Sequence, residues 1–268
     1  MDSSRWADEI LMVDGGSTDA TPDIAREEYG ATVYTRPYDF SSHQYNYITA
    51  RAETDWVFVL DSDEVISPEL AEEIRSVIGG SPDYDIYRVP RKLIDHGRWL
   101  RCCRTWPDYC VRLYRPGKFV FQLDRVHAGG WPKGPYGTLE ESIIHYSFDD
   151  FADHLERANT FTTWSALEYY DRGKNPGWLS MFLRFGGTFW REFLQGVPGL
   201  MYCVIRATEV FAKYAKVWEL HDGSSSLDIE AEQKKKLRAA KDILSDPEQP
   251  DLLRELYPDL APDKDESE

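Results

Sequence analysis

Short apolar runs alternate with amphipathic segments through roughly the first 90 residues. The runs at 9–14, 31–35 and 56–61 are mainly apolar, which is typical of buried strands. The segments between them, including 42–53, are predicted to be helices. This alternation predicts a parallel α/β sheet.

Capping residues predict where two helices begin. Ser17 follows two glycines and is the expected N-cap of the first helix. A second helix is expected to start after Ser67, since Pro68 suits the first helical position and Glu69 complements the positive end. These two boundaries rest on local sequence alone.

The pattern changes beyond residue 90. Apolar segments at 109–115, 118–123 and 142–148 favour further strands, and the helical pattern begins at Asp149. The fold class is therefore α/β, with a mixed sheet flanked by helices and then a helical region. The expected parts are a catalytic domain, a helical region and a disordered acidic tail at residues 1–147, 148–258 and 259–268.

Composition narrows the class of protein. The chain has 268 residues and 42% hydrophobic content, enough for one sizeable core and a smaller second one. Its net charge of −16 argues against a protein that holds nucleic acid mainly by charge. The start lacks a signal peptide pattern, no apolar run reaches membrane-spanning length, and the four cysteines form no C-x-x-C pair. We therefore expect a cytoplasmic protein.

Three acids follow two of the predicted strands. Asp14 ends the first run, and Asp61 and Asp63 end the third. Ligands of open α/β sheets bind beyond the carboxyl ends of the strands. Along extended backbone Asp61 and Asp63 would point the same way, so both could reach one ligand. Their oxygens suit Mg²⁺ or Mn²⁺ held together with substrate phosphates, which favours a nucleoside diphosphate site.

Two other interpretations of these acids are open. Acids that follow strands often cap helices, and that role suits Asp19. The stretch VFVLDSDEVI also fits the D-x-D-x-[TV] pattern of haloacid-dehalogenase-type phosphotransferases, with Asp61 as nucleophile and Asp63 as general acid. Those enzymes usually carry the motif on their first strand, whereas here it follows a later one. We therefore favour the nucleoside diphosphate site.

Several stretches together resemble family-2 inverting glycosyltransferases of GT-A fold: WADEILMVDGGSTDAT, HQYNYITARAETDWVFVLDSDEVISPEL, WPDYCVRLYR and VH. The subgroup with the greatest similarity is that of bacterial enzymes adding glucose or heptose to the lipopolysaccharide core. The resemblance covers roughly residues 4–220, with two separated motifs in the family's order. It implies a GT-A fold and a sugar-nucleotide substrate.

The resemblance also implies roles for individual residues. Asp14 would contact the nucleoside of the donor, and Asp61 the ribose or the sugar. Asp63 would bind the divalent metal, Mg²⁺ or Mn²⁺, that bridges the diphosphate and stabilises the charge of the leaving group. The full set of expected donor-binding residues is Asp14, Gly15, Ser17, Gln44, Asn46 and Asp61.

The catalytic base is less certain from the sequence. Inversion needs one base to take the proton from the acceptor hydroxyl. Where the subgroup commonly has His-Glu, an alanine follows His127 here, so the usual acid is missing. Asp124 and His127 are the favoured candidates and Asp108 is a third, while His127 could also be a metal ligand. Asp108 could instead pair with Arg112. Asp124 could pair with Arg125 or stabilise a turn.

The start of the chain departs from the family pattern. The family normally has an apolar strand and a helix ahead of the stretch WADEI, and that strand helps to hold the nucleotide base. This chain begins in a segment that resembles the end of that helix. Without the strand, sheet edges would be left unpaired, so we expect that the start was assigned too late.

The segment 172–218 differs in charge from the rest of the chain. It holds seven basic and two acidic residues, a net charge of +5 within a chain of −16. Gly186-Gly187 and Pro198 are expected to divide it into at least two helices. A stripe of aromatic residues flanked by arginines is typical of a helix lying in a membrane surface, and the alternative is a stripe packed on the sheet. The stripe consists of Trp178, Phe182, Phe185, Phe189 and Phe193.

These observations predict an inverting, metal-assisted transferase that moves a sugar from a nucleoside diphosphate sugar, most simply a UDP-sugar. The expected acceptor is a glycolipid, a lipopolysaccharide core or another lipid-linked oligosaccharide, reached by peripheral contact with the inner membrane face. The alternative from another class is a non-catalytic relic that binds nucleotide sugar without turnover, or binds nothing, because the first strand and the usual acid are missing.

Overall fold

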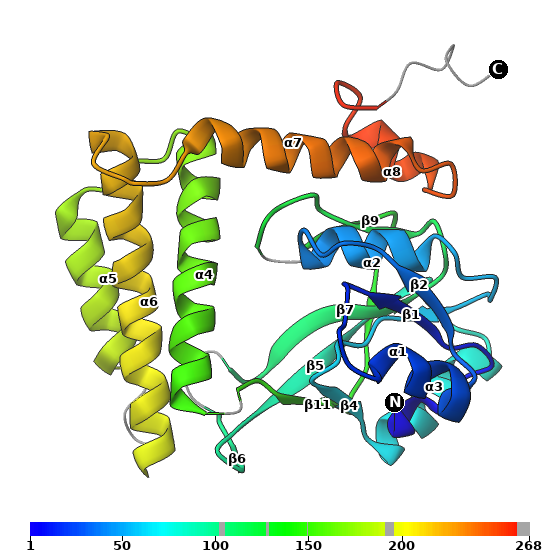
Figure 1. Cartoon of the computed structure of the whole chain (residues 1–268). Coiled ribbons are helices and arrows are strands. Elements are labelled where there is room, and N and C mark those ends of the chain that lie inside the picture. Colours follow the sequence, from blue (N-terminus) through cyan, green and yellow to red (C-terminus); the bar gives the residue numbers. More distant parts are fainter. Residues whose placement is uncertain (102–104, 127–128, 149, 191–195, 262–268) are drawn as a thin grey trace. The chain divides into compact units, whose positions relative to one another are not determined.

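The computed structural model describes residues 1–101, 105–126, 129–148, 150–190 and 196–261 (Figure 1). The chain forms two compact units, each built from separate stretches of sequence. The first unit contains Met1–Pro90, Tyr109–Ile143 and Lys234–Glu268, and the second contains Arg91–Asp108 and Ile144–Gln233. The predicted functional boundaries at 147 and 258 stay a prediction.

The predicted parallel sheet is confirmed only for the first two runs of the chain. The third run, which contains β3 (Val57–Phe58), lies in another sheet and pairs antiparallel with β7 (Asp108–Tyr114). Strands β1 (Leu11–Asp14) and β2 (Thr32–Thr35) pair in parallel, with Leu11 opposite Thr32. Helix α1 (Thr21–Tyr29) makes the crossover between them. A short 3₁₀ turn, η1 (Asp2–Ser4), precedes β1 at the start of the chain. The crossover leaves Asp14 at the carboxyl end of β1, where ligands of such sheets bind.

The larger sheet is mixed, which agrees with the predicted fold class. Its main path has the strand order β3-β7-β5-β11-β4, and β6 and β10 also pair with β5. Strand β3 pairs antiparallel with β7, whereas β10 pairs parallel with β5. The bounds are β3 Val57–Phe58, β4 Glu64–Ile66, β5 Ile86–Asp95, β6 Arg98–Trp99, β7 Asp108–Tyr114, β10 Gly137–Thr138 and β11 Ile143–Tyr146. Strands β8 (Phe119–Phe121) and β9 (Gly130–Pro132) form a separate antiparallel pair.

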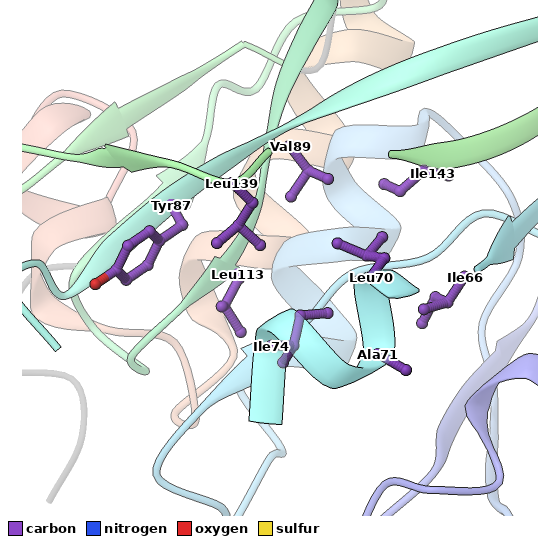
Figure 2. Close-up of a cluster of buried hydrophobic side chains, with 9 residues drawn as sticks. All are labelled: Ile66, Leu70, Ala71, Ile74, Tyr87, Val89, Leu113, Leu139 and Ile143. Atoms are coloured by element: carbon purple, nitrogen blue, oxygen red, sulfur yellow. The ribbon is translucent and has the colours of Figure 1, made fainter. Parts of the chain in front are cut away.

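Helix α3 (Pro68–Gly79) provides much of the core of the first unit. It begins where the sequence predicts, because the Ser67 hydroxyl accepts the backbone N–H of Leu70 at 3.1 Å. Leu70 and Ile74 point from this helix into a cluster with residues of β5, β7 and β11 (Figure 2). Both are almost fully buried, so truncating either to alanine would cost about 2–5 kcal/mol.

Helices from both ends of the chain cover the strand pair β8–β9. Helix α2 (Ser41–Thr49) buries four polar side chains, which is unusual for a helix near the surface. Helices α7 (Ile229–Ser245) and α8 (Asp251–Leu256) pack their apolar side chains on β8 and on the residues after it. That cluster consists of Val120, Leu123, Ala240, Ile243, Leu244 and Leu253, with Tyr47 of α2 beside it.

The helices of the second unit are α4 (Phe151–Asp171), α5 (Trp178–Trp190) and α6 (Gly196–Asp222). Asp150 caps α4 by accepting the backbone N–H of Asp153 at 2.9 Å. Leu167 of α4 and Val217 of α6 are fully buried against each other's helices. Within the described ranges, no helix combines the length and the apolar character needed to cross a membrane.

Two predicted helix boundaries are wrong, each for a local reason. Ser17 is not an N-cap, because its backbone N–H is donated to Asp14 and α1 begins only at Thr21. Gly186-Gly187 lies inside α5, which packs along α6 and so tolerates the roughly 1 kcal/mol that each glycine costs a helix. The prediction of at least two helices is nevertheless confirmed by α5 and α6. Pro198 lies in the first turn of α6, where its missing N–H needs no partner.

Candidate active site

The turn after β1 holds Asp14 by backbone hydrogen bonds. The carboxylate accepts the N–H of Gly16 at 3.2 Å and that of Ser17 at 3.1 Å. Hydrogen bonds from the side chain and the backbone of Ser17, with that of Gly16, lower the pKa of Asp14. Gly16 has φ +107°, and a Cβ on Gly15 would lie 3.2 Å from the Cβ of Tyr38. Three of the predicted donor-binding residues, Asp14, Gly15 and Ser17, are therefore brought together.

A second turn follows β3 and contains Asp61 and Asp63. The N–H of Glu64 donates to the carbonyl of Asp61 at 3.1 Å, and the N–H of Asp61 donates to the Glu64 carboxylate at 3.1 Å. The expectation of extended backbone here is wrong, since these two hydrogen bonds fold the chain back into β4. The side chains of Asp61 and Asp63 are thus placed by a turn rather than by strand alternation.

A buried arginine from β7 fixes this second turn. Nη2 of Arg112 lies 2.6 Å from Asp61 Oδ2 and 2.8 Å from Glu64 Oε1. The hydroxyl of Tyr45 donates to the other oxygen of Asp61. Burial alone would lower the pKa of Arg112, but the carboxylates of Asp61 and Glu64 raise it well above its usual value. Arg112 is therefore a permanent cation between two carboxylates.

Helix α2 connects this turn to the other candidate residues. Ser42, Tyr45 and Asn46 have the spacing of one helix face. The Ser42 hydroxyl donates to the backbone carbonyl of Asp124 at 3.1 Å. Asn46 exchanges two 2.9 Å hydrogen bonds with the backbone of Phe121. One face of α2 therefore contacts the Asp61 turn, β8 and the Asp124 loop.

The two amides predicted to line the donor pocket are both buried. The Gln44 amide donates to the carbonyl of Arg36 at 3.1 Å, and its oxygen accepts from the Arg36 guanidinium at 3.3 Å. The Asn46 amide is bonded to Phe121, as described above. In this structure both amides therefore order the backbone around α2. Their contact with a donor stays a prediction.

The structure places two of the three candidate bases. Asp124 Oδ1 lies 3.8 Å from the ammonium of Lys236 on α7, and its suggested pair with Arg125 stays a prediction. Asp108 pairs with Arg91 at 2.7 Å, so the suggested pair of Asp108 with Arg112 is wrong. His127 lies outside the described residues.

The residues of the second turn fit a divalent cation only in part. Across the described residues, no three His, Cys, Asp or Glu side chains are grouped as a metal site. Asp61 and Glu64 are occupied by Arg112. Asp63, half-buried in the same turn, remains the residue that would hold Mg²⁺ or Mn²⁺. One carboxylate is enough when the diphosphate supplies further oxygens, since Mg²⁺ is usually bound in that way.

Comparison with known proteins defines the class. Residues 5–122 match the family described as glycosyl transferase family 2, and they contain Asp14, Asp61, Asp63 and Arg112. This match supports a family-2 glycosyltransferase with the GT-A fold of that family. This assignment favours glycosyl transfer over the phosphotransferase interpretation.

Similar proteins share most of their length with this chain. An uncharacterized glycosyltransferase of Rickettsia bellii is 29% identical over 234 residues, which is 80% of this chain and 78% of the relative. The lipopolysaccharide core biosynthesis glycosyltransferase LpsC of Rhizobium meliloti is 26% identical over 228 residues, which is 77% of this chain and 84% of the relative. An uncharacterized glycosyltransferase of Rickettsia conorii is 28% identical over 239 residues, 81% of this chain and 82% of the relative.

Proposed function

We propose that this protein is an inverting glycosyltransferase that moves a hexose or heptose from a nucleoside diphosphate sugar to a lipid-linked or oligosaccharide acceptor. The observation that carries the proposal is the pair of turns after β1 and β3. Each turn orients a carboxylate, Asp14 or Asp61, in the segment that matches family 2. The name of LpsC supports an acceptor of the lipopolysaccharide-core class.

The donor would bind across these two turns. Asp14 is ionised at neutral pH, because hydrogen bonds lower its pKa, and it can accept hydroxyl or imino protons of a nucleoside. Asp61 is oriented by Arg112 and Tyr45, and its side chain is 25% exposed, so it can still accept a hydroxyl of ribose or sugar. A divalent cation on Asp63 would stabilise negative charge on the departing diphosphate.

The acceptor would be deprotonated by Asp124 or His127. The backbone of Asp124 is fixed by Ser42, and the carboxylate is partly exposed beside the Lys236 ammonium. A single general base satisfies an inverting reaction. Because Ser42 and Tyr45 lie on the same face of α2, the candidate base and Asp61 share one support.

Exposed apolar side chains in the second unit support contact with a membrane surface. On α5, Leu183 is 67% exposed, and Leu179 and Phe182 are exposed beside it. On α6, four exposed apolar residues recur at intervals of seven: Val197, Val204, Phe211 and Trp218. Basic residues of the 172–218 segment would complement anionic lipids. We therefore place the protein in the cytoplasm, peripheral to the inner face of the membrane.

Calorimetric titration of UDP and of GDP with Mn²⁺ tests the donor site. We expect metal-dependent binding of one nucleotide by the intact chain and loss of the metal dependence in Asp63→Asn. Asp83→Asn changes an exposed acid outside the two turns and is the matched control. Absence of nucleotide binding by the intact chain would contradict the enzyme and favour the non-catalytic relic.

Sedimentation with lipid vesicles tests the membrane surface. We expect the chain to sediment with vesicles rich in anionic lipid and to stay in solution with neutral ones. Leu183→Asp should reduce the bound fraction strongly, since it places a charge within the exposed apolar face of α5. Leu237→Asp changes an exposed leucine of α7 and should bind as the intact chain does. Equal binding by both variants would exclude α5 from the contact.

A further inference from the structure

Arg112 of β7, which fixes the second turn, affects how a cation can bind there. Arg112 is 5% exposed as a side chain and Glu64 is completely buried. The guanidinium contacts both carboxylates through one nitrogen, at 2.6 and 2.8 Å. Two of the three acids in the sequence DSDE, Asp61 and Glu64, are therefore already paired with one cation that belongs to the protein.

We propose that Arg112 is a positioning residue that withholds Asp61 and Glu64 from the divalent cation, so that the cation binds only together with the nucleoside diphosphate. A cation could recruit Asp61 or Glu64 only by displacing Arg112. That exchange would break at least one of the two ion pairs of the buried guanidinium, which is unfavourable. The proposal rests on the proposed function, because it concerns the same donor and metal.

The remaining ligands must then come from the donor. Mg²⁺ and Mn²⁺ keep several waters and take oxygens from one or two carboxylates and from substrate phosphates. With Asp61 held by Arg112, a diphosphate supplies the oxygen ligands of the cation that the protein does not. By thermodynamic reciprocity, the cation must then strengthen nucleotide binding by the same factor by which the nucleotide strengthens cation binding.

The same arrangement assigns a separate task to Asp61. Its Oδ1 accepts from Tyr45 and its Oδ2 from Arg112, so its plane is fixed before any ligand binds. A donor hydroxyl can therefore approach this partly exposed carboxylate without its reorientation. Arg112 thus separates the acid that binds sugar or ribose from the acid that binds metal.

Electron paramagnetic resonance of free Mn²⁺ provides the test. The intact chain should bind Mn²⁺ weakly alone and roughly tenfold more tightly, or better, with UDP or GDP, whichever the calorimetry selects, since allosteric couplings are typically 5–150-fold. Arg112→Gln should bind Mn²⁺ without nucleotide, because Asp61 and Glu64 become available. Arg112→Lys keeps the charge and should behave as the intact chain does.

Two further variants keep the test decisive. Arg115→Gln removes an arginine that lies outside the second turn and pairs with Asp85, whose side chain is 43% exposed, and it should leave Mn²⁺ binding unchanged. If Arg112→Gln melts below the working temperature, the double variant Glu64→Gln, Arg112→Gln frees Asp61 without leaving two buried like charges. It should also bind Mn²⁺ alone.

Opposite results would overturn the proposal. These are Mn²⁺ binding by the intact chain that is equally tight with and without nucleotide, or a folded Arg112→Gln that gains no Mn²⁺ binding. Failure of the proposed function looks different, since no nucleotide would then bind to any variant. In that case a gain of Mn²⁺ binding in Arg112→Gln would still support the withholding role of Arg112, and its absence would overturn it.

Discussion

The two turns that follow β1 and β3 hold their acids in different ways. Asp14 is bound by backbone N–H groups two and three residues ahead of it in the chain. Asp61 is bound by side chains 16 and 51 residues away, those of Tyr45 and Arg112. The first acid is therefore set by a local turn, and the second is set only when the sheet and α2 have assembled around it. Substitutions in the two turns should differ accordingly.

The largest effect is expected at the long-range turn. Arg112→Met should lower the free energy of unfolding by about 3–5 kcal/mol, because it leaves the fully buried Glu64 and the partly buried Asp61 without their counter-ion. Urea unfolding followed by circular dichroism measures the loss. A loss below about 1 kcal/mol would mean that the ion pairs of Arg112 stabilise the fold no more than ordinary surface ion pairs do. The contrast between the two turns would then disappear.

In the local turn, the backbone should matter more than the side chains. Gly16→Ala should cost about 1–3 kcal/mol, because φ +107° is strained for any residue with a Cβ. No atom lies within 4 Å of the added Cβ, so the cost is conformational rather than steric. Gly79→Ala is the matched control, since Gly79 has equal space and lies in α3. An unchanged melting temperature in Gly16→Ala would contradict this account.

Acid should weaken the local turn specifically. Since the folded state lowers the pKa of Asp14, its contribution is present above the unfolded value of about 3.9 and disappears as the pH falls through the folded value. Asp14→Asn should therefore be less stable than the intact chain near pH 7, and the difference should shrink progressively below about pH 4. Urea unfolding of both proteins across this range gives the difference. A constant difference would mean that ionisation of Asp14 contributes nothing.

The smallest effect is expected from the Tyr45 hydroxyl, which donates to Asp61 in the second turn. Tyr45→Phe removes one hydrogen bond to Asp61 and should cost about 0.5–1.5 kcal/mol. Water can replace the donor because the Asp61 side chain is 25% exposed. Tyr29→Phe removes a comparable hydroxyl from the exposed Asp2 and should be near neutral in the same thermal melts. A loss as large as that of Arg112→Met would make Tyr45 an equal partner in fixing Asp61.

Local signals were sufficient for some of these features. The start of α3 follows from Ser67 and Pro68, and the strand ending at Asp14 follows from an apolar run before two glycines. Ser17 failed as a cap because Asp14 accepts its N–H and holds it in the turn after β1. Helix α1 begins only at Thr21, four residues later.

Long-range features were not accessible in the same way. The arginine in the strand segment YCVRLYR is a signal, since a charged residue among apolar ones needs a buried partner. Sequence proximity suggested Asp108, but four residues of extended strand separate it from Arg112 by about 13 Å. Arg112 instead pairs with acids from the turn after β3. Gly186-Gly187 similarly failed as a break, because packing between α5 and α6 outweighs weak helix propensity.

The hydrogen bonds of α2 have a consequence for altering this enzyme by design. Ser42 and Tyr45 bind the loop of Asp124 and the turn of Asp61 to the same helix, α2. A change in the tilt of α2 would displace Asp61 and Asp124 together. Selectivity for the proposed donor could therefore not be altered there independently of selectivity for the acceptor. Libraries aimed at a new donor sugar should therefore leave residues 41–49 intact and diversify the flanking loops.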